Sequence, residues 1–343
     1  MVSMDIEELK GIVKKFDQIR ILVIGDLMLD TFIRGNLVRI SDEAPVPVLD
    51  FSTEIVRPGG AANAMSNIIS LDGKVIAVGV MGNDAAGKRL HQLFSDRGID
   101  TEGVVISDKR RTVEKTRIIA EKFQQNVLRI DKTNDTEIGA EETELLLEFV
   151  QKKIDSVDTV LVSDYNDGII TKELLEKVIP LAKSRKKTIV IDSKRAHLLD
   201  YRNVDIFKVS LQVASEITGV GQINETSIRN IGQWMLTQLE SEYVLITEGR
   251  NGMTLFEKNG NVTHIPSVSK EPGEVTGVAD TVGAVLALSL GVDQSKVAAA
   301  AVLANTAAGI KVGKIGSATV TRDELTAKLG VLNSDSLMHK ITR

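Results

Sequence analysis

The chain has 343 residues, of which 43% are apolar, and this is enough for a large buried core. Its formal net charge is −5 with both signs interspersed, so it lacks the basic face that nucleic-acid binding requires. The absence of cysteine excludes a disulfide framework and a cysteine-built zinc site, and every apolar run is too short or too interrupted to span a bilayer.

The sequence predicts one folded unit. Residues 1–15 are charged and lack the apolar segment of a signal peptide, so we expect a cytoplasmic protein without a membrane partner. No Pro/Ser-rich linker and no repeat interrupts the chain. We therefore expect a single domain over residues 1–332 and a loose C-terminal tail over residues 333–343.

Short β-branched runs alternate with segments of helical periodicity over most of the chain. The runs are apolar along their length, as parallel strands are when helices cover both faces of a sheet. This alternation predicts an α/β fold with a doubly wound, mostly parallel sheet. The predicted strands are Ile21–Ile24, Val75–Val80, Thr159–Ser163, Thr188–Asp192 and Tyr243–Thr247, and the predicted helices include Glu142–Ile154, Lys172–Ala182, Ser227–Leu239 and Val297–Val312.

Two stretches depart from this rhythm. Thr31–Phe51 and Thr112–Asp131 alternate polar and apolar residues and have no helical pattern beside them. A period of two indicates strands with one buried face. We therefore expect antiparallel strands of a small second sheet that projects from the main one.

Carboxylates follow several of the predicted strands. Asp26 and Asp30 come after the first, Asp164 and Asp167 after the third, and Asp192 ends the fourth. In open α/β sheets the ligand crevice lies past the C-terminal ends of the strands. The set suits a polyhydroxylated substrate or a magnesium-bound phosphate, although each Asp can also simply cap a turn or helix.

A glycine pair precedes the helical run Ala64–Leu71. Gly59 and Gly60, within the stretch Arg57–Asn63, allow a backbone to approach a ligand closely. Asn63 offers both a donor and an acceptor to sugar hydroxyls. The alternative is an ordinary glycine turn into a helix.

The stretch Glu274–Thr281 leads into the apolar run Val282–Leu290 and predicts a turn followed by a helix N-terminus. The free N–H groups and the dipole of such a terminus attract anions. Asp280 in the first turn is placed to take a proton from an attacking hydroxyl, while the migrating phosphoryl group rests on backbone amides. The alternative is that Thr276 or Asp280 merely caps the helix.

Together these features resemble the PfkB (ribokinase-like) carbohydrate kinase family, and within it the bacterial heptose-7-phosphate kinases of ADP-heptose synthesis. The similarity runs from about Ile21 to Val320. No nucleotidyltransferase segment follows, so the chain resembles the single-activity form. The most specific tracts are Gly25–Asp30, Arg39–Ser41, Glu43–Val48, Arg57–Asn63, Ser163–Tyr165 and Val312–Gly316.

The resemblance implies a ribokinase-like fold whose small sheet is a lid over the sugar. It implies an ATP-dependent phosphotransferase that acts on a hydroxyl of a sugar phosphate, with heptose 7-phosphate as the expected acceptor. The implied cofactors are ATP and Mg²⁺, with a neighbouring site for a monovalent cation as a further expectation. A homodimer formed through the lid is expected from the family as well.

The resemblance also implies roles for individual residues. Asp280 is the expected catalytic base, and Gly277, Val278 and Ala279 are expected to form the anion hole. The residues expected to hold the sugar are Asp30, Gly59, Gly60, Asn63 and Asp164. Those expected at the nucleotide are Ser210, Thr247, Gly249, Gly252 and Asn305, and those expected at the metal are Glu216 and Glu274.

Two basic residues of the lid are further candidates. Lys115, Arg117 and Ile119 share one face of a predicted strand, because side chains alternate between the faces of a sheet. Lys115 and Arg117 are therefore expected to reach a phosphate group of the substrate. The alternative is a charged strand that faces solvent.

The chain departs from the family at several active-site positions. The family pattern Gly-Ala-Gly-Asp is here Gly277–Asp280, which puts the bulky Val278 beside the phosphate. Glu274 stands where the family has Asp, and Asp167 where the heptose kinases have Lys.

The metal-organising motif of the family has also changed. Its Asn-x-x-Glu motif is here Ser210–Val213, and Val213 cannot bind a metal. Glu216 lies one helical turn further on the same face and is the candidate replacement.

Two functions remain open from the sequence. The first is an active sugar-phosphate kinase, which the retained Asp280, Asp30 and Asn63 favour. The second is a catalytically impaired protein of the same fold that binds a sugar or nucleotide and regulates a partner, which the departures favour. A dinucleotide-dependent oxidoreductase is excluded, since no G-x-G-x-x-G follows the first strand.

Overall fold

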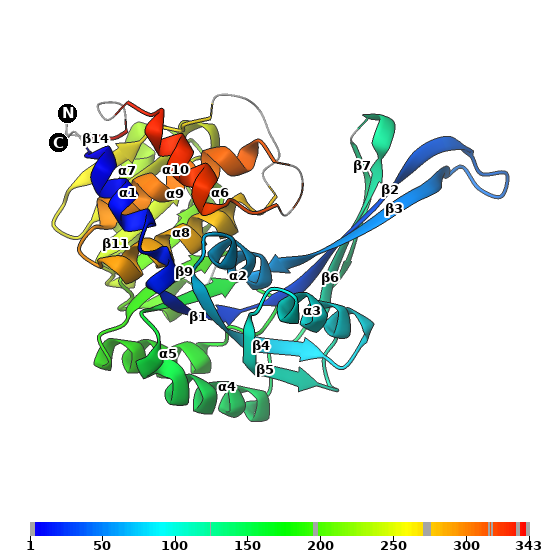
Figure 1. Cartoon of the computed structure of the whole chain (residues 1–343), viewed down its shortest axis with the longest axis horizontal. Coiled ribbons are helices and arrows are strands. Elements are labelled where there is room, and N and C mark those ends of the chain that lie inside the picture. Colours follow the sequence, from blue (N-terminus) through cyan, green and yellow to red (C-terminus); the bar gives the residue numbers. More distant parts are fainter. Residues whose placement is uncertain are drawn as a thin grey trace.

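A ten-stranded sheet forms the centre of the molecule (Figure 1). The computed structural model describes residues 4–123, 125–194, 198–269, 276–314, 316, 318–333 and 337–340. The strands in spatial order are β14 (His339–Lys340), β13 (Val262–Ile265), β12 (Met253–Glu257), β11 (Tyr243–Thr247), β10 (Ile206–Ser210), β9 (Thr188–Ser193), β8 (Thr159–Asp164), β1 (Arg20–Gly25), β4 (Lys74–Gly82) and β5 (Asp100–Ser107). All neighbours from β5 to β11 pair in parallel, and β12, β13 and β14 add an antiparallel edge.

Helices cover both faces of this sheet, as a doubly wound fold requires (Figure 1). One face packs against α1 (Ile6–Val13), α2 (Ala61–Ser70), α3 (Ala85–Ser95), α8 (Val278–Val292), α9 (Val297–Val312) and α10 (Arg322–Gly330). The other packs against α4 (Ala140–Lys153), α5 (Lys172–Ser184), α6 (Leu211–Thr218) and α7 (Glu225–Leu239). The predicted strands and helices are confirmed.

The lid is a separate four-stranded sheet that projects from the body (Figure 1). Its spatial order is β3 (Pro47–Gly60), β2 (Leu27–Ile40), β6 (Val113–Ala120) and β7 (Gln125–Lys132). The pairs β2–β3 and β6–β7 are antiparallel, as the alternating sequence predicts. At the centre of the lid, β2 and β6 pair in parallel, so the two antiparallel pairs are joined into a mixed sheet.

The C-terminal segment differs from the expected loose tail where it is described. Leu337 and Met338 are buried, and the following strand β14 pairs with β13 so that His339 lies opposite His264. The apolar pair has a place in the core, and β14 covers an otherwise open sheet edge. Within the described ranges, no helix combines the length and apolar character needed to cross a membrane.

The order of the strands locates the crevice. From β1 the chain moves to β4 and β5 on one side, and later returns to β8 and β9 on the other. Ligands of open α/β sheets bind where the strand order reverses, at the C-terminal ends of the strands. Asp26 directly follows β1 and Asp164 ends β8, so both lie at this point.

Gly25, the last residue of β1, should be essential for the closeness of these strands. A methyl group at this position would lie 2.2 Å from the carbonyl oxygen of Ser163 and 2.7 Å from Cβ of Ala61. We expect Gly25→Ala to lower the free energy of unfolding by at least about 1–3 kcal/mol, measured by urea denaturation.

Gly11 provides the matched control. It lies inside α1, and a methyl group there would meet no atom within 4 Å. Gly11→Ala should raise the free energy of unfolding by about 0.5–1 kcal/mol, because Ala favours a helix interior over Gly. Equal stability of the Gly25→Ala variant and the unmodified chain would contradict the crowding at β1.

Candidate active site

Asp280 lies in the first turn of α8 and is only 2% exposed. Its Oδ2 accepts a hydrogen bond of 2.6 Å from Nδ2 of Asn63, in the first turn of α2. Its Oδ1 accepts another from the hydroxyl of Tyr165, in the loop after β8. The carboxylate therefore contacts one of the predicted sugar-side residues, Asn63.

Gly277 makes this close approach possible. It is the N-cap of α8 with φ of 77°, a conformation that favours glycine. A methyl group on Gly277 would lie 2.6 Å from Nδ2 of Asn63. Among the described residues, the buried Oδ1 of Asn63 has no hydrogen-bond partner. Since buried acceptors are rarely left unpaired, this oxygen is available to a hydroxyl of a ligand.

The lid contributes a charged face beside Asp280. Arg117 pairs with Asp30 at 2.6 Å, and Lys115 lies 3.9 Å from Asp167. The predicted common face of Lys115 and Arg117 thus points toward the site. Gly59 lies against Asp30, since a methyl group there would be 2.8 Å from its Oδ2.

Tyr165 is a site residue to which the sequence assigned no role. Its ring lies 3.5 Å from Nζ of Lys194 and 5.5 Å from Nζ of Lys115, while its hydroxyl reaches Asp280. Burial raises the pKa of Tyr165, so its hydroxyl remains a donor to the carboxylate. Burial lowers the pKa of Lys194, although the charges of Asp280 and Asp192 oppose this shift. The sequence signals for Tyr165 were its position directly after a strand end and its place in the Ser163–Tyr165 tract of the family resemblance.

A buried ion pair lies beneath the first turn of α8. Nζ of Lys208 in β10 lies 2.6 Å from Oδ1 of Asp192 in β9, and it also donates to the carbonyl oxygen of Ala279 at 3.4 Å. Burial raises the pKa of Asp192, and the charge of Lys208 opposes this shift. The sequence predicted Asp192 as a strand-end carboxylate but missed Lys208, because a lysine inside a strand usually faces solvent.

Two further strand-end carboxylates organise the loop that holds Tyr165. Asp26 is 1% exposed and accepts hydrogen bonds from the backbone of Tyr165 at 2.6 Å and of Ile169 at 3.1 Å. Asp164 was expected to hold the sugar. It accepts hydrogen bonds from the hydroxyl of Tyr201 and, at 2.7 Å, from the backbone N–H of Asn166.

The nucleotide-side predictions converge on one cavity of about 910 Å³. Val278 and Ala279, in the first turn of α8, also line it. Val278 packs partly against the core and leaves the cavity open beside it, despite its size. The predicted residues that line this cavity are Ser210, Glu216, Thr247, Gly249, Gly252 and Asn305.

Local structure explains several of these positions. Ser210 caps α6, where its hydroxyl accepts from the backbone of Val213 at 3.3 Å. Gly249 and Gly252 have φ of 59° and 101° in the turn after β11. Asn305 on α9 donates to the carbonyl oxygen of Pro266 at 2.7 Å.

The carboxylates available to a metal are few. Glu216 is exposed and lines the cavity, whereas the predicted partner Glu274 lies outside the described residues. In the described ranges, no group of three or more His, Asp or Glu side chains could hold a metal ion. Magnesium in nucleotide sites is bound largely by phosphates and water, and by only one or two carboxylates. Glu216 could supply one such carboxylate, but the described residues offer no complete set of metal ligands.

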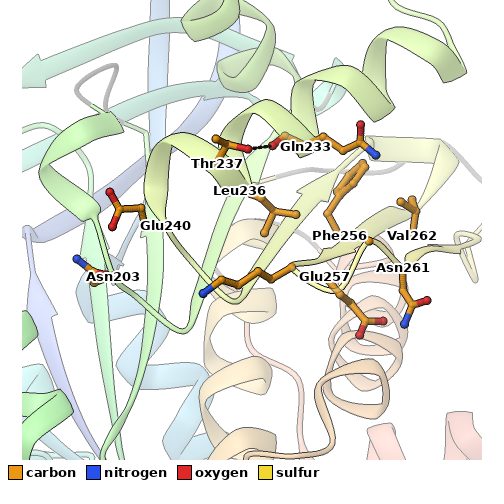
Figure 2. Close-up of a pocket in the computed structure, with 11 residues that line it drawn as sticks. Asn203, Gln233, Leu236, Thr237, Glu240, Phe256, Glu257, Asn261 and Val262 are labelled. Atoms are coloured by element: carbon orange, nitrogen blue, oxygen red, sulfur yellow. Dashed lines mark hydrogen bonds between the residues drawn. The ribbon is translucent and has the colours of Figure 1, made fainter.

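A second concavity of about 650 Å³ lies away from these residues, between α7 and the β12–β13 hairpin (Figure 2). Its lining includes the apolar side chains of Phe256 and Leu236 and the charged side chains of Glu240 and Glu257 (Figure 2). None of the predicted site residues lines it.

Comparisons with known proteins agree with this geometry. The sequence profile described as pfkB family carbohydrate kinase matches residues 18–324. The bifunctional protein HldE of Geobacter metallireducens is 39% identical over 318 residues, which cover 93% of the chain and 64% of that protein. HldE of Geobacter sulfurreducens is 38% identical over 312 residues, which cover 91% of the chain and 63% of that protein. The chain thus spans less than two thirds of the length of these relatives.

Solved structures show the same fold. Phosphofructokinase-2 from Escherichia coli in complex with potassium superposes with a TM-score of 0.74 at 15% identity, covering 91% of this chain and 98% of that one. Ribokinase from Arabidopsis thaliana, in complex with ribose and ATP, superposes with a TM-score of 0.69 at 18% identity, covering 90% and 98%. At such identities the likeness concerns the fold alone, and the predicted α/β architecture is confirmed.

Asp26 should make stability depend on pH. Burial, reinforced by the charge of Asp164, raises the pKa of Asp26 from 3.8 to about 7. Between these values the folded chain holds a proton that the unfolded chain releases, so raising the pH favours unfolding. Relative to Asp26→Asn, which cannot titrate, the unmodified chain should lose up to about 1.4 kcal/mol per pH unit in this range.

Urea denaturation of both proteins at a series of pH values measures this difference. The substitution also replaces one acceptor oxygen by an NH₂ donor, which shifts the stability of the variant at every pH. The pH slope is the decisive quantity. Identical slopes in the two proteins would contradict a titrating Asp26.

Proposed function

The chain belongs to the pfkB family of carbohydrate kinases, and on that premise we propose that it transfers the γ-phosphoryl group of ATP to a hydroxyl of heptose 7-phosphate. One observation carries the proposal. The first turn of α8 bears Asp280, which is bonded to Asn63, and also Val278 and Ala279, which line the 910 Å³ cavity. A hydroxyl beside Asn63 and a phosphate at the cavity's edge would meet at this turn.

The transfer step follows from this arrangement. The Asp280 carboxylate accepts the proton of the sugar hydroxyl, and the hydroxyl oxygen forms a bond to the γ-phosphorus. The bond from that phosphorus to the β–γ bridging oxygen breaks, and ADP leaves. The N–H groups of the first turn of α8 lack partners within the helix and stabilise the charge on the phosphoryl oxygens.

The sugar-side residues support a phosphorylated acceptor. Arg117 and Lys115 bring positive charge to the lid face beside Asp30 and Asn63. Arg and Lys are the usual partners of phosphate groups. The tracts that resemble heptose-7-phosphate kinases favour a heptose among the sugar phosphates. Asp164, which already accepts hydrogen bonds from Tyr201 and Asn166, would act by shaping the loop rather than by direct contact.

The 910 Å³ cavity is within the range of pockets for small ligands and would hold ATP. The ribokinase of similar fold binds ATP, which supports this assignment. Mg²⁺, when bound with the nucleotide, would neutralise phosphate charge, and Glu216 would hold it through water. The Escherichia coli phosphofructokinase-2 structure contains potassium, which supports a monovalent positive charge in this active site. Glu274 was the predicted ligand of a dissolved ion.

The lid also supports the proposed homodimer. Leu128 pairs with Ile118, which alternates with Arg117 along β6, so Leu128 lies on the face opposite to the charged one. Leu128 is 53% exposed and Phe51 is 63% exposed. A cluster of exposed apolar side chains on a projecting sheet is typical of an interaction surface. We propose that a second copy of the chain covers it.

Turnover should depend on Asp280. With ATP, magnesium and a panel of sugar phosphates, the purified chain should release ADP, most rapidly with heptose 7-phosphate. Asp280→Asn should lower kcat by about 10²–10⁴-fold, the usual contribution of a general base. Asp293→Asn, at the other end of α8, is the matched control and should retain the rate of the unmodified chain.

The panel also separates the two functions left open by the sequence. Absence of turnover with every acceptor, combined with thermal stabilisation by ATP or a sugar phosphate, would overturn the kinase proposal and favour a binding protein. Equal rates for the Asp280→Asn variant and the unmodified chain would contradict the assigned base.

The oligomeric state tests the lid surface. Light scattering should give twice the mass of one chain, and the double variant Phe51→Asp with Leu128→Asp should give a monomer, because carboxylates would be buried at the interface. Val331→Asp changes an equally apolar side chain, 77% exposed on α10's end, and should leave the dimer intact. A dimer that persists in the double variant would place the interface elsewhere.

A further inference from the structure

A lysine with no exposed surface lies beside the N-terminus of α8. Lys311 is in the last turn of α9, and its exposure is 0%. Its Nζ donates to the carbonyl oxygen of Gly316 at 2.8 Å and to that of Lys314 at 3.3 Å. Removing an ammonium group from water is costly unless other polar groups replace its hydration. The fold thus holds a cation on backbone carbonyl oxygens at this place.

This cation adjoins the proposed anion hole. A methyl group on Gly277 would lie 3.6 Å from Cε of Lys311 and 2.6 Å from Nδ2 of Asn63. Lys311 and Asn63 therefore meet the backbone of α8 at the same residue, where the anion-binding turn begins. Asn63 in turn donates to Asp280.

Gly316, one of the two residues whose carbonyl oxygens accept from Lys311, lies against the lid. Gly316, with φ of 67°, is so close to the lid that a methyl group there would lie 3.4 Å from Nη1 of Arg57 and 3.5 Å from Cζ of Phe32. Arg117 lies over the ring of Phe32, 5.4 Å from its centroid. Lys311 therefore lies between the N-terminus of α8, at Gly277, and Gly316, which borders the charged lid face.

Carbonyl oxygens that replace a hydration shell are also the groups that bind dissolved monovalent cations. We propose that the Lys311 ammonium acts as a built-in monovalent cation, which is held by the carbonyl oxygens of Lys314 and Gly316 and places a fixed positive charge beside the anion-binding turn of α8. The inference rests on the proposed kinase function and deepens it. The chain would then transfer phosphate without dissolved potassium.

A simpler role for Lys311 is to cap the C-terminus of α9, since a lysine in the last turn stabilises a helix. That role predicts a loss of stability on substitution, but no effect of dissolved cations on turnover. The response to added potassium therefore separates the two roles.

The first arm of the experiment uses the unmodified chain. Its turnover is measured with choline, sodium or potassium as the only monovalent cation. We expect rates that agree within about twofold, because the lysine already supplies the charge. Activation of the unmodified chain by potassium by more than about fivefold would overturn the proposal.

The second arm uses Lys311→Met, which keeps the length of the side chain and removes the charge. In choline its kcat should fall about tenfold or more, with a smaller change in KM for the sugar phosphate, because the charge acts on the phosphoryl oxygens in the transition state. Potassium should restore part of the rate. A loss that potassium does not restore would assign Lys311 a structural role only.

Lys314→Met is the matched control. Lys314 belongs to the same segment but is partly exposed, and it binds Glu324 at 2.6 Å on α10. This variant should behave like the unmodified chain in every salt. An equal, potassium-reversible loss in Lys314→Met would overturn the assignment to Lys311.

A measurement of nucleotide affinity tests the role of Lys311 even without turnover. The affinity for a non-hydrolysable ATP analogue, measured by calorimetry, should fall about tenfold in Lys311→Met in choline and recover in potassium. If the unmodified chain turned over no acceptor, the kinase proposal would fail while this measurement still decided the role of Lys311. Unchanged affinity in the variant would overturn the inference.

Discussion

The hydrogen bond of 2.6 Å between Asn63 and Asp280 joins two helix starts that are 217 positions apart in the chain. Helices α2 and α8 pack on the same face of the sheet, and each begins directly after a glycine with positive φ, Gly60 at 57° and Gly277 at 77°. Both partners are buried, so separating them would leave polar groups without partners at a high cost. The geometry of the site therefore depends on buried contacts between these two distant segments, of which this hydrogen bond is one.

Charge is arranged around this contact with little help from solvent. Asp280 shares its surroundings with Lys194, whose charge it stabilises, and with Asp192, which Lys208 neutralises at 2.6 Å. In a region of low dielectric constant, unbalanced charges would shift their protonation instead of remaining charged. Lysines that alternate with carboxylates would let a carboxylate stay ionised close to bound phosphates.

The sequence predicted the features that repeat along the chain. Continuous apolar runs indicated the central strands, and the period of two placed Lys115 and Arg117 on one lid face, which the structure bears out. It missed contacts that depend on distant segments meeting. Lys311 lies in an Ala-rich helix whose pattern only predicts a core, and its partners are carbonyl oxygens that have no sequence signature. Tyr165 is held in place by Asp26, which directly follows β1 and accepts a hydrogen bond from the backbone of Tyr165 in the loop after β8.

The departures from the family and the buried lysines concern the same small volume. Val213 stands where the resemblance implies a metal-organising glutamate, whereas Lys208 and Lys311 each bring an ammonium group close to the first turn of α8. An exchangeable ion must be bound before each turnover, but a lysine held by the fold is always present. Such a site would always carry its charge, but its activity could not be regulated by the concentration of the ion. The Lys311 side chain on α9 would then belong to the active site through its charge, although it does not itself touch the phosphate.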